Sequence, residues 1–91
     1  VCELGAEEKP FVMMSGHHDT WYYGVMDNGS ANAGMMEAAR LLAQRQGEWK
    51  RGLRICFWSG HSHGRYSGSA WYADTHWDEL DRRCVAHVNV D

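Results

Sequence analysis

Apolar positions in this chain form short continuous runs separated by one long segment with helical spacing. Short runs of this kind are typical of strands. They lie at 11–14, 53–58 and 85–90. Between the first two runs, apolar residues recur at intervals of three and four, which predicts a helix over 31–46 that stops at Gly47. Two further helical segments are expected at about 69–75 and 77–83.

The order of these segments predicts the fold class. Strands that alternate with helices form βαβ units, whose right-handed crossovers give parallel strands with helices on the faces of the sheet. The run at 53–58 is apolar except for Arg54, as in a strand buried on both faces. We therefore expect an α/β fold with a mostly parallel sheet. Three strands are few for such a sheet, so we also expect the chain to be part of a larger domain.

Composition narrows the functional classes. The 91 residues include nine Lys and Arg against twelve Asp and Glu, which is not the basic footprint of a nucleic-acid-binding protein. No apolar run approaches the roughly 20 residues that a membrane span needs. Six histidines are the unusual feature of the composition, and they point to a functional site.

Polar side chains that can do chemistry follow each expected strand. Ligands of open α/β sheets bind beyond the carboxyl ends of the strands, which meet at one edge. The residues expected there are His17, His18, Asp19, Asp27, His61, Ser62, His63 and Asp91. Imidazole nitrogens and carboxylate oxygens suit Zn²⁺, and also Mn²⁺ or Co²⁺. The sequence therefore predicts a metal site at this edge; the alternative is that these strand ends are simply polar.

Individual residues at this edge have different expected roles. His17 is favoured as a metal ligand, because Asp19 can turn its carboxylate to the imidazole N–H that faces away from the ion. Asp27 alone would fit an anion that complements the helix dipole, but the cluster favours a ligand. Asn28 or Ser30 is expected to cap the helix. The aromatic run at 21–23 fits either the lining of a substrate pocket or packing over the sheet edge.

Three motifs follow one another along the chain with a characteristic order. They are Ser-Gly-His-His-Asp at 15–19, Asp-Asn-Gly-Ser at 27–30 and Asn-Val-Asp at 89–91. This order resembles metallopeptidase family 28, which includes zinc aminopeptidases and glutamate carboxypeptidases, and the resemblance covers nearly all of the chain past Pro10. It implies a zinc-peptidase-like three-layer sandwich, of which 1–91 would be the amino-terminal fragment of a single catalytic domain. It also implies a peptide or amino-acyl substrate.

The same resemblance implies a site with two zinc ions. His17 and Asp91 look like ligands of the first metal ion, and Asp19 looks like the carboxylate that supports His17. Asp27 resembles the aspartate that bridges the two ions. The last histidine ligand of the family would lie downstream of residue 91.

One departure from the family pattern affects the expected chemistry. The pattern E-E-x-G-x-x-G-S corresponds here to residues 62–69. Ser62 stands where the family has its general base, and a serine hydroxyl is not a base at neutral pH. His63 stands at the glutamate that binds the second metal, and an imidazole can replace a carboxylate in that role. His61 is an adjacent candidate base, because the intrinsic pKa of imidazole is suitable.

The departure leaves three functions open. The first is a metal-dependent hydrolase of the aminopeptidase type with an altered general base. The second is a catalytically inactive relative that serves as a binding or interaction domain. The third is a single-metal site at which Ser62 and His61 do other chemistry.

Overall fold

The computed structural model describes residues 1–5 and 8–91 of the chain. Its elements are β1 (Cys2–Leu4), β2 (Phe11–His17), α1 (Met26–Ala43), the 3-10 helix η1 (Gln46–Glu48), β3 (Gly52–Trp58), α2 (Ser67–Arg83) and β4 (Cys84–Asn89). In this part of the chain, neither helix is long and apolar enough to cross a bilayer.

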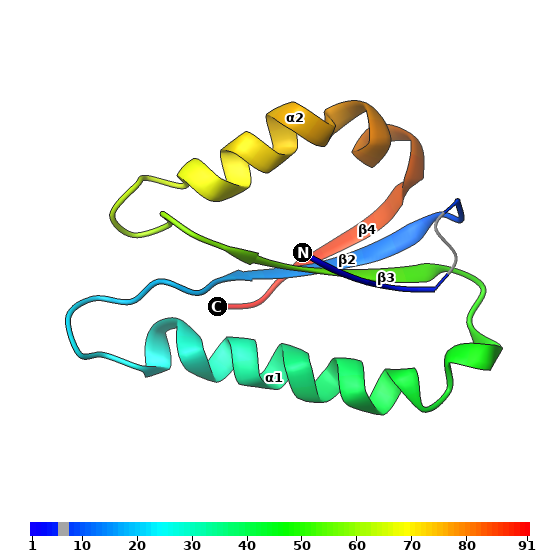
Figure 1. The fold of residues 1–91 in the computed structure, drawn as a ribbon, viewed down its shortest axis with the longest axis horizontal. Coiled ribbons are helices and arrows are strands. Elements are labelled where there is room, and N and C mark those ends of the chain that lie inside the picture. Colours follow the sequence, from blue (N-terminus) through cyan, green and yellow to red (C-terminus); the bar gives the residue numbers. More distant parts are fainter. Residues whose placement is uncertain (6–7) are drawn as a thin grey trace.

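The strands form one sheet that lies between two helical layers. Its order is β1-β3-β2-β4, with β2 parallel to both β3 and β4. Helices α1 and α2 cover opposite faces of the sheet (Figure 1). The α/β class and the mostly parallel sheet are therefore confirmed. Strand β1 was not predicted, because its three residues are too few to show a periodic pattern. It pairs antiparallel with β3.

Alternate side chains of β2 and β3 pack into two separate cores, one on each face of the sheet. The core on the α2 side consists of Phe11, Met13, Cys56 and Tyr72, and the core on the α1 side of Met35, Leu53 and Ile55. Burial raises the pKa of the Cys56 thiol to about 11, so this cysteine behaves as a small apolar side chain. Both strands are thus buried on both faces, which explains their continuous apolar runs.

The helices differ in extent from those predicted. Helix α1 begins at Met26, although Asp27 and Asn28 within it have non-helical backbone angles. It ends at Ala43 and is followed by η1, so Gly47 lies inside the 3-10 turn rather than directly after the helix. The two helical segments expected at 69–75 and 77–83 form the single helix α2, whose backbone departs from helical angles at His76.

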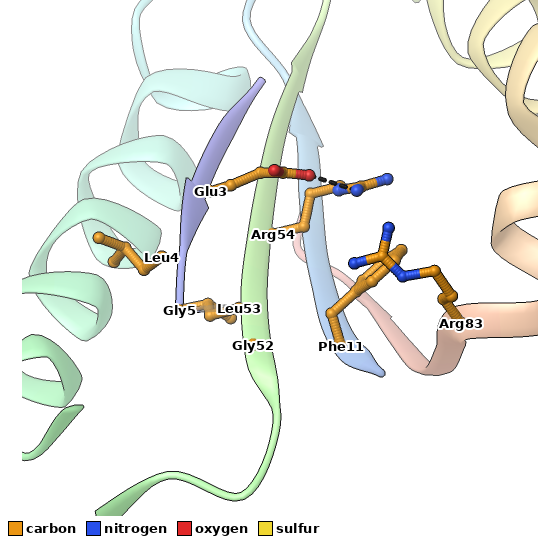
Figure 2. A pocket seen from close by; sticks show the side chains of 8 residues that line it. All are labelled: Glu3, Leu4, Gly5, Phe11, Gly52, Leu53, Arg54 and Arg83. Atoms are coloured by element: carbon orange, nitrogen blue, oxygen red, sulfur yellow. Dashed lines mark ion pairs between the residues drawn. The ribbon is translucent and has the colours of Figure 1, made fainter. Parts of the chain in front are cut away.

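One charged side chain lies inside the layer between β3 and α2. Arg54 is 4% exposed, and its guanidinium forms ion pairs with Glu3 of β1 and Glu79 of α2. It also donates a hydrogen bond to the Tyr72 hydroxyl at 2.9 Å and lies 4.0 Å from the centroid of the Phe11 ring. Figure 2 shows Glu3 reaching from β1 to this guanidinium.

These partners decide the charge state of Arg54. Burial alone would lower the pKa of Arg54, but the interactions with Glu79, Tyr72 and Glu3 raise it above its usual range. A buried charge is tolerated only when it is paired in this way. The single polar interruption of the apolar run at 53–58 therefore joins β3 to both β1 and α2.

We expect the substitution Glu79→Gln to lower the free energy of unfolding by about 1–2 kcal/mol at neutral pH, because a charged partner of a buried cation is lost. The hydrogen bond from Arg54 holds the pKa of Glu79 below its usual value. Its stabilising contribution is therefore present above the unfolded-state pKa and is lost as the pH falls through the folded-state pKa. Urea unfolding of the full chain should show the difference between variant and wild type shrinking towards acid pH.

The matched control for this measurement is Glu37→Gln. Glu37 also pairs with an arginine, Arg40, but both side chains are more than half exposed. Exposed pairs contribute little to stability. Equal destabilisation by the two substitutions would contradict the importance assigned to burial of the Arg54 pairs.

Candidate metal centre

The carboxyl ends of the three parallel strands lie at one edge of the sheet, next to the first turn of α1 (Figure 1). In the register of β2 and β3, His17 pairs with Trp58, the last residue of β3. On the other side of β2, the Val90 N–H donates to the Ser15 carbonyl at 2.8 Å. This pairing extends β4 and brings the next residue, Asp91, beside the end of β2.

His17 is the centre of the polar group at this edge. Its side chain is 3% exposed, and its Nε2 atom lies 2.9 Å from Oδ1 of Asp27 and 3.7 Å from Oδ1 of Asp91. Its Nδ1 atom lies 2.9 Å from the main-chain carbonyl oxygen of Asp19. Because a carbonyl can only accept a hydrogen bond, Nδ1 carries the proton and Nε2 faces the two carboxylates.

The arrangement of donor atoms around His17 shows whether these residues fit a metal ion. In the neutral imidazole with its proton on Nδ1, Nε2 and the carboxylate oxygens all present lone pairs to one another. Such a cluster needs a cation among its members, either a second proton on His17 or a metal ion. One imidazole nitrogen with two carboxylates is a donor set that suits Zn²⁺, Mn²⁺ or Co²⁺. The donors therefore fit a divalent transition-metal ion.

Two asparagines fix the start of α1 against the strand ends. The Asn28 side chain is 1% exposed and donates to the Val90 carbonyl at 3.0 Å, while Asn32 donates to the His17 carbonyl at 3.0 Å. Neither Asn28 nor Ser30 caps α1, because the residue before the helix is Val25 and no side chain caps it. This positioning role was not predicted, since an asparagine at a helix start has the same sequence pattern whether it caps the helix or bonds to a strand.

Gly16 permits this close packing. A Cβ atom at Gly16 would lie 2.8 Å from the Val90 carbonyl oxygen and 3.0 Å from Nδ2 of Asn28. Any side chain here would therefore push apart the backbone of β2, the segment after β4 and the start of α1. The glycine beside His17 is a spatial requirement of the site.

Asp19 joins two loops of the site. Its carboxylate accepts hydrogen bonds from the main-chain N–H groups of Ser62 at 2.9 Å and of His61 at 3.2 Å. Burial acts to raise the pKa of Asp19, but these N–H groups outweigh burial and place the pKa below its usual value. The nearest carboxylate oxygen lies 3.6 Å from Nδ1 of His17, so the close contact to the imidazole is made by the Asp19 main chain instead of the expected carboxylate.

The loop after β3 brings His61 beside His17. The His61 ring stacks on the His17 ring with a centroid separation of 4.1 Å and an interplanar angle of 5°. One potential ligand atom from each of His17, His61 and Asp91 lies within 4.8 Å of the others. The Tyr66 ring packs against the His61 ring at an interplanar angle of 71°, with a centroid separation of 4.8 Å.

His63 is placed differently from His61. Its side chain is exposed, its ring lies 4.0 Å from the Trp21 ring, and its Nε2 atom lies 3.4 Å from the Thr20 carbonyl oxygen. Among the described residues, it does not belong to the group formed by His17, His61 and Asp91. His18 is also exposed.

The aromatic run between His17 and Asp27 is exposed to different extents along its length. Tyr22 and Tyr23 are 91% and 100% exposed, and Trp21 is 48% exposed. Of the two possibilities considered for this run, packing against the sheet is therefore excluded for the two tyrosines.

Comparison with known proteins identifies the family of this chain. The family model of Peptidase family M28 matches residues 1–91. The chain belongs to peptidase family M28. The resemblance inferred from the His-x-Asp, Asp-Asn-Gly-Ser and Asn-x-Asp motifs is thereby confirmed.

Curated relatives of this M28 chain include proteins named for peptidase activity. It is 33% identical to the probable glutamate carboxypeptidase VP8 of Zea mays, with 97% of the chain and 13% of the relative aligned. It is 34% identical to the probable glutamate carboxypeptidase LAMP1 of Arabidopsis thaliana, over 97% of the chain and 14% of the relative. It is 30% identical to the aminopeptidase NAALADL1 of Mus musculus, over 100% of the chain and 13% of the relative.

The M28 chain thus spans only 13–14% of the length of these relatives. No solved structure matches it. What the comparisons establish is membership of a peptidase family.

The position of Asp19 leads to a prediction about metal binding. We expect Asp19→Ala to weaken Zn²⁺ binding about 10–100-fold, because the N–H groups of His61 and Ser62 lose their acceptor and the loop after β3 loses its anchor. Asp19→Asn keeps one acceptor oxygen and should weaken binding less. Competition titration with a chromophoric chelator measures both affinities. Equal losses in the two variants would show that the negative charge of Asp19, rather than its hydrogen bonds, supports the site.

Proposed function

We propose that residues 1–91 form the amino-terminal part of a metal-dependent catalytic domain that removes residues from the end of a peptide. The observation that carries the proposal is the convergence of Asp27 and Asp91 on Nε2 of His17, at 2.9 and 3.7 Å. These three residues come from separate elements and form a donor set for a divalent ion. Membership of a peptidase family supports the same conclusion.

In this proposal His17, Asp27 and Asp91 hold the first metal ion, Zn²⁺ by preference. A second ion would be held by Asp27 and by an imidazole of the loop after β3, which stands in place of the glutamate of the family pattern. A pair of divalent ions at such a site polarises the substrate carbonyl and lowers the pKa of water. The chain contributes the orientation of His17 through the Asp19 carbonyl and the close approach of the strand ends at Gly16.

The names of the relatives support exopeptidase activity, with an amide bond as the bond that is cleaved. They include glutamate carboxypeptidases and an aminopeptidase, which act at opposite ends of a peptide. We therefore propose a peptide or amino-acyl compound as the substrate, with either end open to attack.

The second candidate function is that of an inactive relative that binds without hydrolysis. The sequence His-Ser-His at 61–63 favours it, because no carboxylate stands at the position of the general base. Loss of a general base typically lowers the rate about 10²–10⁴-fold. The two candidates therefore differ in turnover rather than in the first metal site.

We expect the full-length protein, loaded with Zn²⁺, Mn²⁺ or Co²⁺, to release terminal residues from a panel of peptides and amino-acyl amides. His17→Ala should lower kcat/KM more than about 100-fold, because it removes the imidazole at the centre of the donor set. His18→Ala is the matched control, since His18 is the exposed neighbour and should leave turnover unchanged. Bound metal without release of any residue would establish the inactive relative instead.

A further inference from the structure

Resting on the proposed function, we infer that His61, and not His63, supplies the imidazole ligand of the second metal ion. The family pattern assigned that position to His63. The placement of the two rings in the structure points to His61 instead.

The first reason is the relation between the His17 and His61 rings. The lone pair of an imidazole nitrogen lies in the plane of its ring. The two ring planes are parallel to within 5°, with centroids 4.1 Å apart, so their lone pairs do not converge on one point. In this orientation the two imidazoles do not direct their lone pairs at one shared ion, which leaves His61 to bind a neighbouring ion.

The second reason is the spacing between these parallel planes. The planes cannot be further apart than the ring centroids, at 4.1 Å. Metal ions in two-metal hydrolytic sites lie about 3.5–4 Å apart. An ion in the plane of the His61 ring and an ion in the plane of the His17 ring can therefore lie at this separation.

The third reason is that both the main chain and the ring of His61 have fixed neighbours. Its main-chain N–H donates to Oδ1 of Asp19, and its carbonyl accepts a hydrogen bond from the Tyr66 N–H at 3.2 Å. Its ring contacts the rings of both His17 and Tyr66. An imidazole fixed in this way is prepared to bind an ion with little reorganisation.

His63 has none of these features. Its ring packs against Trp21 on the exposed surface, and its Nε2 atom lies nearest the Thr20 carbonyl oxygen. Ligation by His63 would require that contact to be given up. If His61 binds the ion, its ligating nitrogen is no longer free to accept a proton.

Metal stoichiometry tests this assignment directly. The metal-free full-length protein is titrated with Co²⁺, and the bound ion is counted by elemental analysis after desalting. We expect two ions for wild type, one for His61→Ala and two for His63→Ala. Two ions in His61→Ala, or one in His63→Ala, would overturn the assignment, as would fewer than two in wild type. Two ions in His61→Ala together with lost turnover would identify His61 as the general base.

A second pair of variants tests the assignment by the appearance of a spectroscopic signal, where the alanine variants test it by the loss of a bound ion. His61→Cys places a thiolate at the proposed ligand position, and Co²⁺ bound by a thiolate has a charge-transfer band in the near ultraviolet. We expect this band in His61→Cys and not in His63→Cys, each measured against wild type with its three native cysteines. The reverse pattern, or the absence of the band from both, would contradict the inference. The predicted bands and ion counts without peptide hydrolysis would disprove the proposed function while leaving the role of His61 intact.

Discussion

The candidate site depends on a close approach of three backbone segments around Gly16. The end of β2, the residues after β4 and the start of α1 meet where an added Cβ atom would lie 2.8 Å from the Val90 carbonyl. Asn28 uses that same carbonyl as its hydrogen-bond acceptor. Since His17, Asp27 and Asp91 each lie next to one of these contact points in the sequence, the spacing of their side chains is set by main-chain packing.

A second set of interactions holds the layers together away from the site. Arg54 joins β1, β3 and α2 through ion pairs and the Tyr72 hydroxyl. The other face relies on apolar contacts of Met35 with Leu53 and Ile55. Helix α2 is thus attached by apolar packing around Tyr72 together with the ion pairs of Arg54, and α1 by apolar burial.

The sequence predicted the fold class because buried parallel strands have long apolar runs, and because helices and strands alternate along the chain. Strand β1 escaped prediction, since it is short and its stability comes from pairing with β3. The gathering of polar residues at the carboxyl edge could also be anticipated from topology alone. What could not be anticipated was the choice between His61 and His63, because both follow β3 and only the path of the loop decides which ring lies beside His17.

The contacts of Asp19 have a consequence for how this loop can vary. Its carboxylate binds the main-chain N–H groups of His61 and Ser62, and every residue except proline offers such a group. These hydrogen bonds to Asp19 therefore do not depend on which side chains stand at positions 61 and 62. A segment held in this manner can exchange carboxylates for imidazole and hydroxyl groups without moving its backbone, so the chemistry at this edge can diverge while the scaffold stays the same.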